Sequence, residues 1–276
     1  MKVNLKNYDW LVVNTSAGKD SQAMLDWVVK LAERDGVKDR VVAVHCDIEE
    51  EWPGTRQLAE EQARHYGVRF EVVRREKGGI LAHVEQRHAS LRAAGKQYTP
   101  PWPSPSVRYC TGDHKTAQVA KLFTRLAEES RRLHGPGHRT RILNCLGMRA
   151  GESCAREKLL PFRLDKDNTN GRRVVHTWLP LFRWGVGLVW SRIRHAGTRT
   201  HRAYALGMPR LSCVFCIFAP RNALLLAGKH NRELLDRYVA VEKRTGFAFR
   251  RELPLAEVRA ALDRGEEPGE IKSWEM

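Results

Sequence analysis

The sequence has no long hydrophobic run. No window approaches the roughly 18 consecutive apolar residues that a membrane-spanning helix requires. The first residues, Met1–Lys6, also lack the apolar segment of a secretory leader. These absences argue against a membrane-embedded or exported protein, and we expect a cytoplasmic one.

Cysteine is scarce, and the expected compartment limits what it does. The chain has six cysteines among 276 residues. In a reducing compartment structural disulfides are rare, so metal binding or thiol reactivity becomes the relevant question. Cys46, inside an apolar run, is expected to be a core residue.

Acidic residues are outnumbered along the whole chain. The sequence has 48 Lys and Arg against 32 Asp and Glu, a formal net charge of +16. Such a surface attracts polyanions, although charge alone is equally compatible with a very soluble, arginine-rich protein. Clustered arginines favour a large anionic substrate: Arg131-Arg132, Arg172-Arg173, the group Arg192, Arg194, Arg199 and Arg202, and Arg250-Arg251.

Apolar runs typical of buried parallel strands alternate with helical periodicity through most of the chain. This alternation predicts an α/β fold with a doubly wound, mostly parallel sheet. Strands are expected at 10–14, 41–47, 70–73 and 141–147, helices at 20–32, 55–66 and 113–129, and a last sheet segment at 178–181. Loops are expected at the proline-rich stretch 95–105 and at 165–173. We expect residues 1–200 to form the nucleotide-binding α/β domain and 201–276 a mostly helical, cysteine-containing extension with a loosely ordered tail from Gly265.

A short run of small and polar residues joins the first expected strand to the first helix. It comprises Ser16, Ala17, Gly18, Lys19, Asp20 and Ser21. Such a turn aims backbone N–H groups and a helix N-terminus at phosphates. Lys19 would add a positive charge, the two serines hydroxyl donors, and Asp20 a ligand for Mg²⁺. An ordinary strand-to-helix turn is the alternative interpretation.

This run matches neither the Walker pattern nor the dinucleotide Gly-x-Gly-x-x-Gly. It resembles the Ser-Gly-Gly-Lys-Asp-Ser signature of the PP-loop ATP pyrophosphatases, or adenine nucleotide alpha hydrolases, with Ala17 in place of the first glycine. That resemblance implies a HUP-like fold that binds ATP or a close adenine nucleotide.

Further segments, in the same order along residues 10–220, resemble the phosphoadenosine phosphosulfate (PAPS) reductase branch of that superfamily. They are Asp47 with Trp52-Pro53-Gly54-Thr55; Arg108-Tyr109-Cys110-Thr111 with Lys115; Gly147-Met148-Arg149-Ala150-Gly151-Glu152-Ser153 with Arg156; Pro180–Trp184 with Val189-Trp190; and Tyr204 and Gly207 before Cys213-Val214-Phe215-Cys216. Each of these motifs is weak, and their order carries the resemblance.

Two groups outside the loop are expected in the nucleotide site. Asp47 ends a strand, where open α/β sheets bind ligands, although it could instead cap the following helix. Arg149, Glu152 and Arg156 would share one face if a helix begins there, offering two cations to a phosphoryl or sulfuryl group. A solvated ion-pair face is the alternative. Gly147 precedes this group and is expected to border the nucleotide.

The cysteines suggest a metal site through the resemblance. Members of the PAPS reductase branch that use adenosine 5′-phosphosulfate (APS) hold a [4Fe–4S] cluster on an upstream Cys-Cys pair and a downstream C-x-x-C. Here Cys110, Cys213 and Cys216 match three of these ligands, and Cys154 is the first candidate for a fourth, ahead of Cys145. An open fourth iron position, a zinc site and an unmetallated pair remain alternatives.

The expected reaction follows from the resemblance. PAPS and APS reductases carry a Glu-Cys-Gly-type terminal segment whose thiolate attacks sulfur, whereas no cysteine follows Cys216 here. We therefore expect an ATP pyrophosphatase that releases AMP and pyrophosphate and activates a substrate for sulfur transfer, with DNA phosphorothioation as the setting. A sulfonucleotide (PAPS/APS) reductase is the first alternative, and a non-catalytic nucleotide- or nucleic-acid-binding subunit the second.

The expected cofactors are ATP with Mg²⁺, and the cluster named above. The expected partners are a nucleic acid, DNA before tRNA, a sulfur donor such as a cysteine desulfurase, and a second copy in a homodimer.

Overall fold

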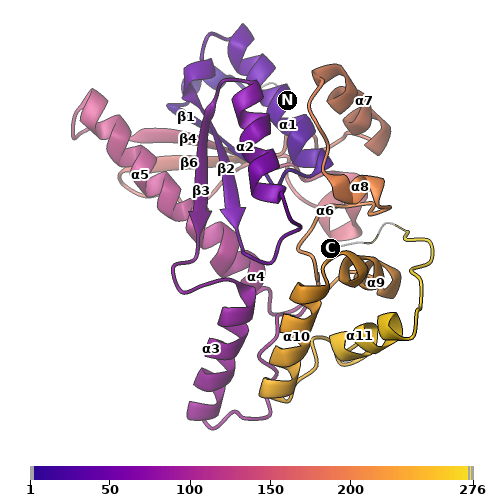
Figure 1. Ribbon diagram of the computed structural model, residues 1–276. Helices are drawn as coiled ribbons and strands as arrows, with labels where there is room; N and C mark the ends of the chain where they lie inside the picture. Colours follow the sequence, from indigo (N-terminus) through magenta and orange to yellow (C-terminus); the bar gives the residue numbers. More distant parts are fainter. Residues whose placement is uncertain (1–2, 273, 275–276) are drawn as a thin grey trace. The chain divides into compact units, whose positions relative to one another are not determined.

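A six-stranded sheet forms the centre of the α/β fold in the computed structural model, which describes residues 3–272 and 274 (Figure 1). The strand order is β3-β2-β1-β4-β6-β5. The strands are β1 (Trp10–Asn14), β2 (Val41–Asp47), β3 (Arg69–Arg74), β4 (Thr140–Cys145), β5 (Phe162–Leu164) and β6 (Arg173–Trp178). β1 is parallel to β2 and β4, and β4 is parallel to β6, whereas the edge strand β5 is antiparallel to β6. The predicted fold class is confirmed.

Alternating side chains of the strands supply both faces of the sheet. Val12 and Ile142 belong to a buried cluster with residues of α5, whereas Leu11 and Leu143 belong to a second cluster with residues of α1 and α7. Because successive strand residues point to opposite faces, an unbroken apolar strand needs helices on both sides. The sheet is therefore doubly wound.

The chain divides into two compact units. The first unit comprises residues 1–46, 54–73 and 116–201, and the second unit comprises 47–53, 74–115 and 202–276. Helices of the first unit are α1 (Lys19–Arg34), α2 (Thr55–His65), α5 (Ala117–His134), α6 (Cys154–Glu157) and α7 (Val186–Ala196), with 3₁₀ turns at Leu5–Asn7, Lys38–Arg40 and Ala150–Glu152. Helices of the second unit are α3 (Ile80–Ala93), α4 (Tyr109–Thr111), α8 (Arg202–Ala205), α9 (Arg221–His230), α10 (Arg232–Thr245) and α11 (Leu255–Asp263), and a π-helical turn follows α4 at Gly112–Thr116.

The second unit has its own apolar core, built from residues far apart in sequence. Trp102, from the proline-rich stretch, is buried, stacks on Tyr238 at 5.8 Å between ring centroids, and donates from Nε1 to the Phe247 carbonyl at 2.8 Å. The expected loop is thus ordered and contributes to the core. Glu50 is buried and accepts from the backbone N–H of Ile80 at 2.7 Å, which caps the start of α3.

Several predicted elements are confirmed and others were missed. β1 and β2 have the predicted bounds, and the predicted helix at 113–129 corresponds to most of the π-helical turn Gly112–Thr116 and to the larger part of α5. β6 begins at Arg173, five residues before the predicted sheet segment. Its burial alternates, so its pattern lacks the continuous apolar run of the central strands. β5 and α3 were not predicted; α3 carries no strong apolar stripe, and β5 has only three residues.

No helix in residues 3–272 or at 274 is long and apolar enough to cross a membrane. The predicted tail from Gly265 has no regular structure up to residue 272, but Glu266 pairs with Arg221 and Asn222 donates to the Glu270 carbonyl at 3.1 Å. The end of that tail, residues 273, 275 and 276, lies outside the described residues.

Candidate phosphate-binding site

The end of β1 is tied to the end of its neighbour β4. The Asn14 side-chain amide donates to Asn144 Oδ1 at 2.7 Å and to the Cys145 carbonyl at 3.0 Å. These polar side chains were not predicted as site residues, although a polar residue inside an apolar run is a readable signal. The bonds hold the two strand ends from which the loop Ser16–Ser21 and the segment at Gly147 depart.

The loop Ser16–Ser21 is closed by its own serines. Ser16 N–H donates to Ser21 Oγ at 3.1 Å, and the same hydroxyl donates to the Gly18 carbonyl at 2.9 Å. Ala17 between them is buried and has φ +56°, in the left-handed region. A residue with a side chain costs about 1–2 kcal/mol there. This is the position where the resemblance expects glycine.

The N-terminus of α1 opens directly from this loop. Gly18 is the N-cap residue and makes no side-chain hydrogen bond to the first turn of α1. The first N–H groups of a helix have no partner within the helix and carry its positive dipole end. Backbone and helix together therefore offer an anion site at the carboxyl end of β1.

Three charged side chains gather at this helix N-terminus. Asp20 Oδ1 accepts from Arg149 Nε at 2.6 Å, and its other carboxylate oxygen lies 3.4 Å from Lys19 Nζ. Arg149 also donates to the Trp184 carbonyl at 3.3 Å. Lys19 and Arg149 are 6% and 8% exposed, so their charges are only weakly screened by water. The cluster carries one net positive charge beside the helix dipole.

Gly147 packs directly against the first turn of α1. A Cβ atom on Gly147 would lie 3.2 Å from the carbonyl carbon and oxygen of Asp20 and from the Ser21 nitrogen. Only glycine allows the two backbones to come this close without displacement. Gly147 thus packs against the backbone of the loop, and its expected place beside the nucleotide stays a prediction.

Glu152 joins Arg149 to Arg156. Its carboxylate accepts from the Arg149 backbone N–H at 2.8 Å and forms an ion pair with Arg156 Nη1. The three residues do not share one helix face: the 3₁₀ turn Ala150–Glu152 ends before Ser153, which caps α6. The residues meet because Glu152 bridges the arginines. Their roles toward a nucleotide remain predictions.

Asp47 ends β2 and is the first residue of the second unit. Its carboxylate accepts from the Glu49 N–H at 3.0 Å. Asp47 does not cap the following helix, because the N-cap of α2 is Gly54. Its predicted role in nucleotide binding stays a prediction.

Three of the predicted metal ligands lie together in the second unit. Cys110, Cys213 and Cys216 are each partly buried and pack against the same core. Burial raises the pKa of Cys213 to about 12, and the nearby Cys216 and Cys110 thiols add to this rise. The pKa of Cys216 is raised by the same burial. The backbone of this region is held by the Val214 N–H, which donates to the Glu50 carbonyl at 3.0 Å.

The thiols as they stand do not form a metal site. Within residues 3–272 and 274, no group of three or more His, Cys, Asp or Glu side chains is arranged to hold a metal ion. Thiolates are the form that binds iron or zinc, whereas burial keeps Cys213 and Cys216 protonated. Cys154 is exposed in the first unit, and Cys145 is buried in β4 with a raised pKa. The iron–sulfur cluster and its zinc alternative therefore remain predictions.

A family comparison now identifies the fold around this loop. The family model of the phosphoadenosine phosphosulfate reductase domain matches residues 10–219. The chain belongs to the PAPS reductase family. The matched segment starts with β1 and extends past Cys216, so the loop and the three grouped cysteines all lie within the PAPS reductase domain.

Individual similar proteins are distant. An uncharacterized 37.8 kDa protein of Escherichia phage 186 is 28% identical over 123 residues, which are 45% of this chain and 34% of that protein. The chain thus matches about a third of that relative's length. Among solved structures, a PAPS reductase from Candida auris in a phosphate complex has 14% identity and a TM-score of 0.47, with 76% of this chain and 83% of that chain covered. An FMN adenylyltransferase from Candida glabrata in complex with FAD and inorganic pyrophosphate has 15% identity and a TM-score of 0.44, with 74% and 54% covered.

Proposed function

We propose that this PAPS reductase family member is an ATP pyrophosphatase that cleaves ATP to AMP and pyrophosphate to activate a substrate for sulfur transfer. The observation that carries the proposal is the loop Ser16–Ser21 at the N-terminus of α1, with Lys19 and Arg149 beside it. A helix N-terminus flanked by two buried cations attracts a polyphosphate, because few water molecules screen their charges.

The carboxylate of Asp20 favours a nucleoside triphosphate over a sulfonucleotide. A carboxylate inside an anion site repels the anion unless it has a second task. Mg²⁺ that accompanies ATP takes carboxylate oxygens as ligands and neutralises phosphate charge, so Asp20 is the residue that would hold it. Asp20 is bound by Arg149 here, and transfer of that carboxylate to a cation would leave the guanidinium available to phosphate oxygens.

The chemistry requires little acid–base help from the protein. An oxygen of the acceptor attacks the α-phosphorus of ATP, the bond to the α–β bridging oxygen breaks, and pyrophosphate leaves with the electron pair. A sulfur nucleophile from a donor then displaces AMP from the adenylated acceptor. Lys19, Arg149 and the N–H groups of α1 would stabilise the charge that develops on the departing pyrophosphate.

The test is product analysis with Lys19→Ala and a matched control. Lys30→Ala removes the same charge from the exposed far end of the same helix. We expect wild type and Lys30→Ala to form AMP and pyrophosphate from ATP and Mg²⁺ in the presence of an acceptor. Lys19→Ala should lose about 10²–10³-fold in rate, the usual effect of removing one charge-stabilising group. Formation of ADP and phosphate would contradict the proposal.

The second candidate function is a sulfonucleotide reductase. The family match itself favours it, because the matched model is that of a PAPS reductase domain. Thioredoxin-dependent release of sulfite from PAPS or APS, without formation of pyrophosphate from ATP, would replace the first proposal. ATP affinity unchanged by Lys19→Ala, with no turnover, would indicate a binding subunit. DNA phosphorothioation, a cysteine desulfurase as donor and a homodimer stay predictions.

A further inference from the structure

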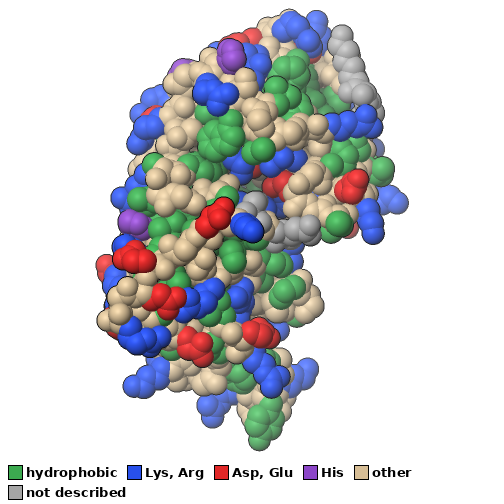
Figure 2. Space-filling view, turned by 90° about the vertical axis from the view of Figure 1, so that its right-hand side faces the viewer, with side chains coloured by type: hydrophobic (Ala, Val, Ile, Leu, Met, Phe, Trp, Pro, Cys, Tyr) green, Lys and Arg blue, Asp and Glu red, His purple; other side chains and the backbone are tan. Residues whose placement is uncertain are grey.

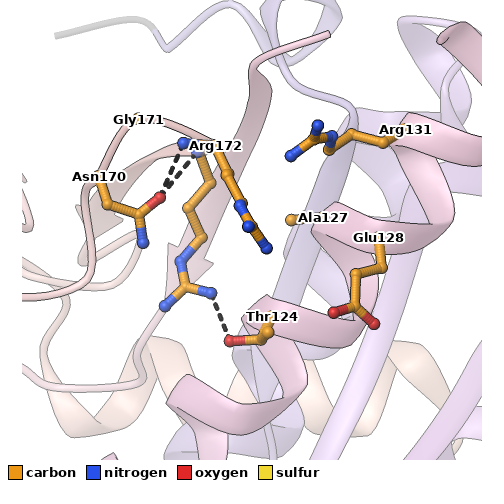
Figure 3. A pocket seen from close by; sticks show the side chains of 8 residues that line it. Thr124, Ala127, Glu128, Arg131, Asn170, Gly171 and Arg172 are labelled. Atoms are coloured by element: carbon orange, nitrogen blue, oxygen red, sulfur yellow. Dashed lines mark hydrogen bonds between the residues drawn. The ribbon is translucent and has the colours of Figure 1, made fainter. Parts of the chain in front are cut away.

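The basic charge of the protein is widely dispersed. Figure 2 shows Lys and Arg side chains over the whole of one face, interspersed with Asp and Glu. One pocket in the first unit instead concentrates arginines. It is a cavity of about 420 Å³ between α5 and the loop that precedes β6, and it is lined by Arg131, Arg172 and Arg173 (Figure 3). Glu128 is the only acidic residue among its lining residues.

Two of these arginines point into the same space without a partner. The guanidinium groups of Arg131, from α5, and Arg172, from the loop, face each other across the pocket in Figure 3. Within the described residues, neither guanidinium makes a hydrogen bond or an ion pair. Both cations line the same cavity, so an anion inside it would be attracted to both.

The wall of the pocket is held in place by its own hydrogen bonds. Arg173 donates to Thr124 Oγ1 on α5 at 2.6 Å and to the Asn168 carbonyl at 2.8 Å. Asn170 Oδ1 accepts from the backbone N–H of Arg172 at 2.9 Å and of Arg173 at 3.2 Å. The loop is thus fixed to α5 through Arg173, while the Arg172 side chain is left for a ligand.

This pocket is distinct from the candidate phosphate-binding site. β1, β4 and β6 are parallel, so Asn14 and Cys145 lie at one end of the sheet, and Thr140 and Arg173 lie at the other. A strand of six residues spans about 20 Å. Arg131 and Arg172 therefore act on a different group from the one bound by the loop Ser16–Ser21.

We propose that this arginine pocket binds the phosphodiester backbone of a nucleic acid strand. Facing guanidinium forks match the paired oxygens of a phosphate, and the net charge of +16 favours a polyanion over a single small anion. Arg139, whose guanidinium donates to the Asn170 carbonyl at 3.0 Å, adds a further cation at the same loop. The proposal does not depend on ATP cleavage.

The test is binding of a fluorescent 12-nucleotide single strand to the full chain as salt is varied. The pocket variant is Arg131→Ala/Arg172→Ala. Its control is Arg34→Ala/Arg64→Ala, which removes the same charge from exposed positions of the first unit that form only surface ion pairs. We expect the pocket variant to lose affinity on the order of tenfold and about 1.4 units of salt slope, about 0.7 for each arginine on a single strand, and the control to change little.

Two further variants keep the outcome clear. Arg131→Lys/Arg172→Lys retains the charge but loses the fork, so its affinity should fall between wild type and the alanine pair, and it serves if the alanine pair does not fold. Lys19→Ala should bind the strand normally, which separates this proposal from the proposed ATP cleavage. Equal losses in pocket and control variants would overturn it. Binding of inorganic phosphate or AMP in the pocket, with no binding of the strand, would overturn it as well.

Discussion

The loop Ser16–Ser21 and the cysteine group Cys110, Cys213 and Cys216 are two motif regions of one family domain, yet they are built differently. The loop is a continuous segment, closed by Ser21 and joined by Arg149 and Gly147. The cysteines come from two segments about 100 residues apart and pack against an apolar core, where burial raises the pKa of Cys213 and of Cys216. The loop already has the form of a binding site, whereas the cysteine group does not have that of a metal site.

This difference shows what must change in each region before it can bind a ligand. The loop offers N–H groups and cations that an anion can meet without rearrangement. Cys213 and Cys216 would have to lose their protons before they could hold a metal, because burial favours the neutral form of these thiols. We therefore expect the loop to act in the isolated chain and the cysteines to respond to metal supply.

The largest effect that tests this contrast is the reactivity of Cys213. With its pKa raised to about 12, its thiolate fraction at pH 9 is on the order of 10³ lower than that of an ordinary thiol. Alkylation of Cys213 in the folded protein should therefore be much slower than in urea, as measured by mass spectrometry of the Cys213 peptide. Rapid alkylation of folded Cys213 at pH 9 would break the contrast.

The raised pKa of Cys213 also makes the free energy of unfolding depend on pH. The folded pKa of Cys213 lies above the unfolded value of about 8.5. The contribution of the Cys213 thiol to the free energy of unfolding is therefore complete below about pH 8.5. It is lost as the pH rises toward 12, because the thiol releases its proton in the unfolded chain before it does so in the folded chain. Cys213→Ser should flatten this part of the curve of unfolding free energy against pH.

Gly147→Ala tests whether the loop Ser16–Ser21 must keep its position to act. The added methyl group would press on the backbone of Asp20 and Ser21, so we expect a loss of about 1–3 kcal/mol in unfolding free energy. A shift of the loop by a fraction of an ångström should lower AMP formation by up to about 10²-fold. Gly151→Ala, which meets nothing within 4 Å, is the matched control. Equal activity of the two variants would show that the loop tolerates displacement.

The smallest effect concerns Ala17. Ala17→Gly removes the cost of φ +56°, about 1–2 kcal/mol, but loses a buried methyl group and adds freedom to the unfolded chain. The unfolding free energy should therefore change by less than about 1 kcal/mol, and AMP formation by less than about threefold. Ala17→Val, with a β-branched side chain at the same φ, should be clearly destabilised in thermal unfolding. A large gain in activity for Ala17→Gly would show that the alanine strains the site.

The sequence by itself determined the α/β class and the loop. The apolar runs of β1 and β2 and the residues from Ser16 to Ser21 are local patterns. Hydrophobic periodicity and turn-forming residues can be recognised in the sequence without knowledge of distant contacts. The ordered motifs also indicated the PAPS reductase family, which the family match over residues 10–219 confirms.

Only the tertiary structure decided which distant groups meet. Arg149 joins Asp20 across 129 residues, and Arg131 faces Arg172 across a pocket formed by α5 and a loop. The structure also decided that Trp102 is a core residue and that burial raises the pKa of Cys213 and of Cys216. These outcomes depend on which surfaces the folded chain buries together, because burial and the approach of charges are properties of the packed chain.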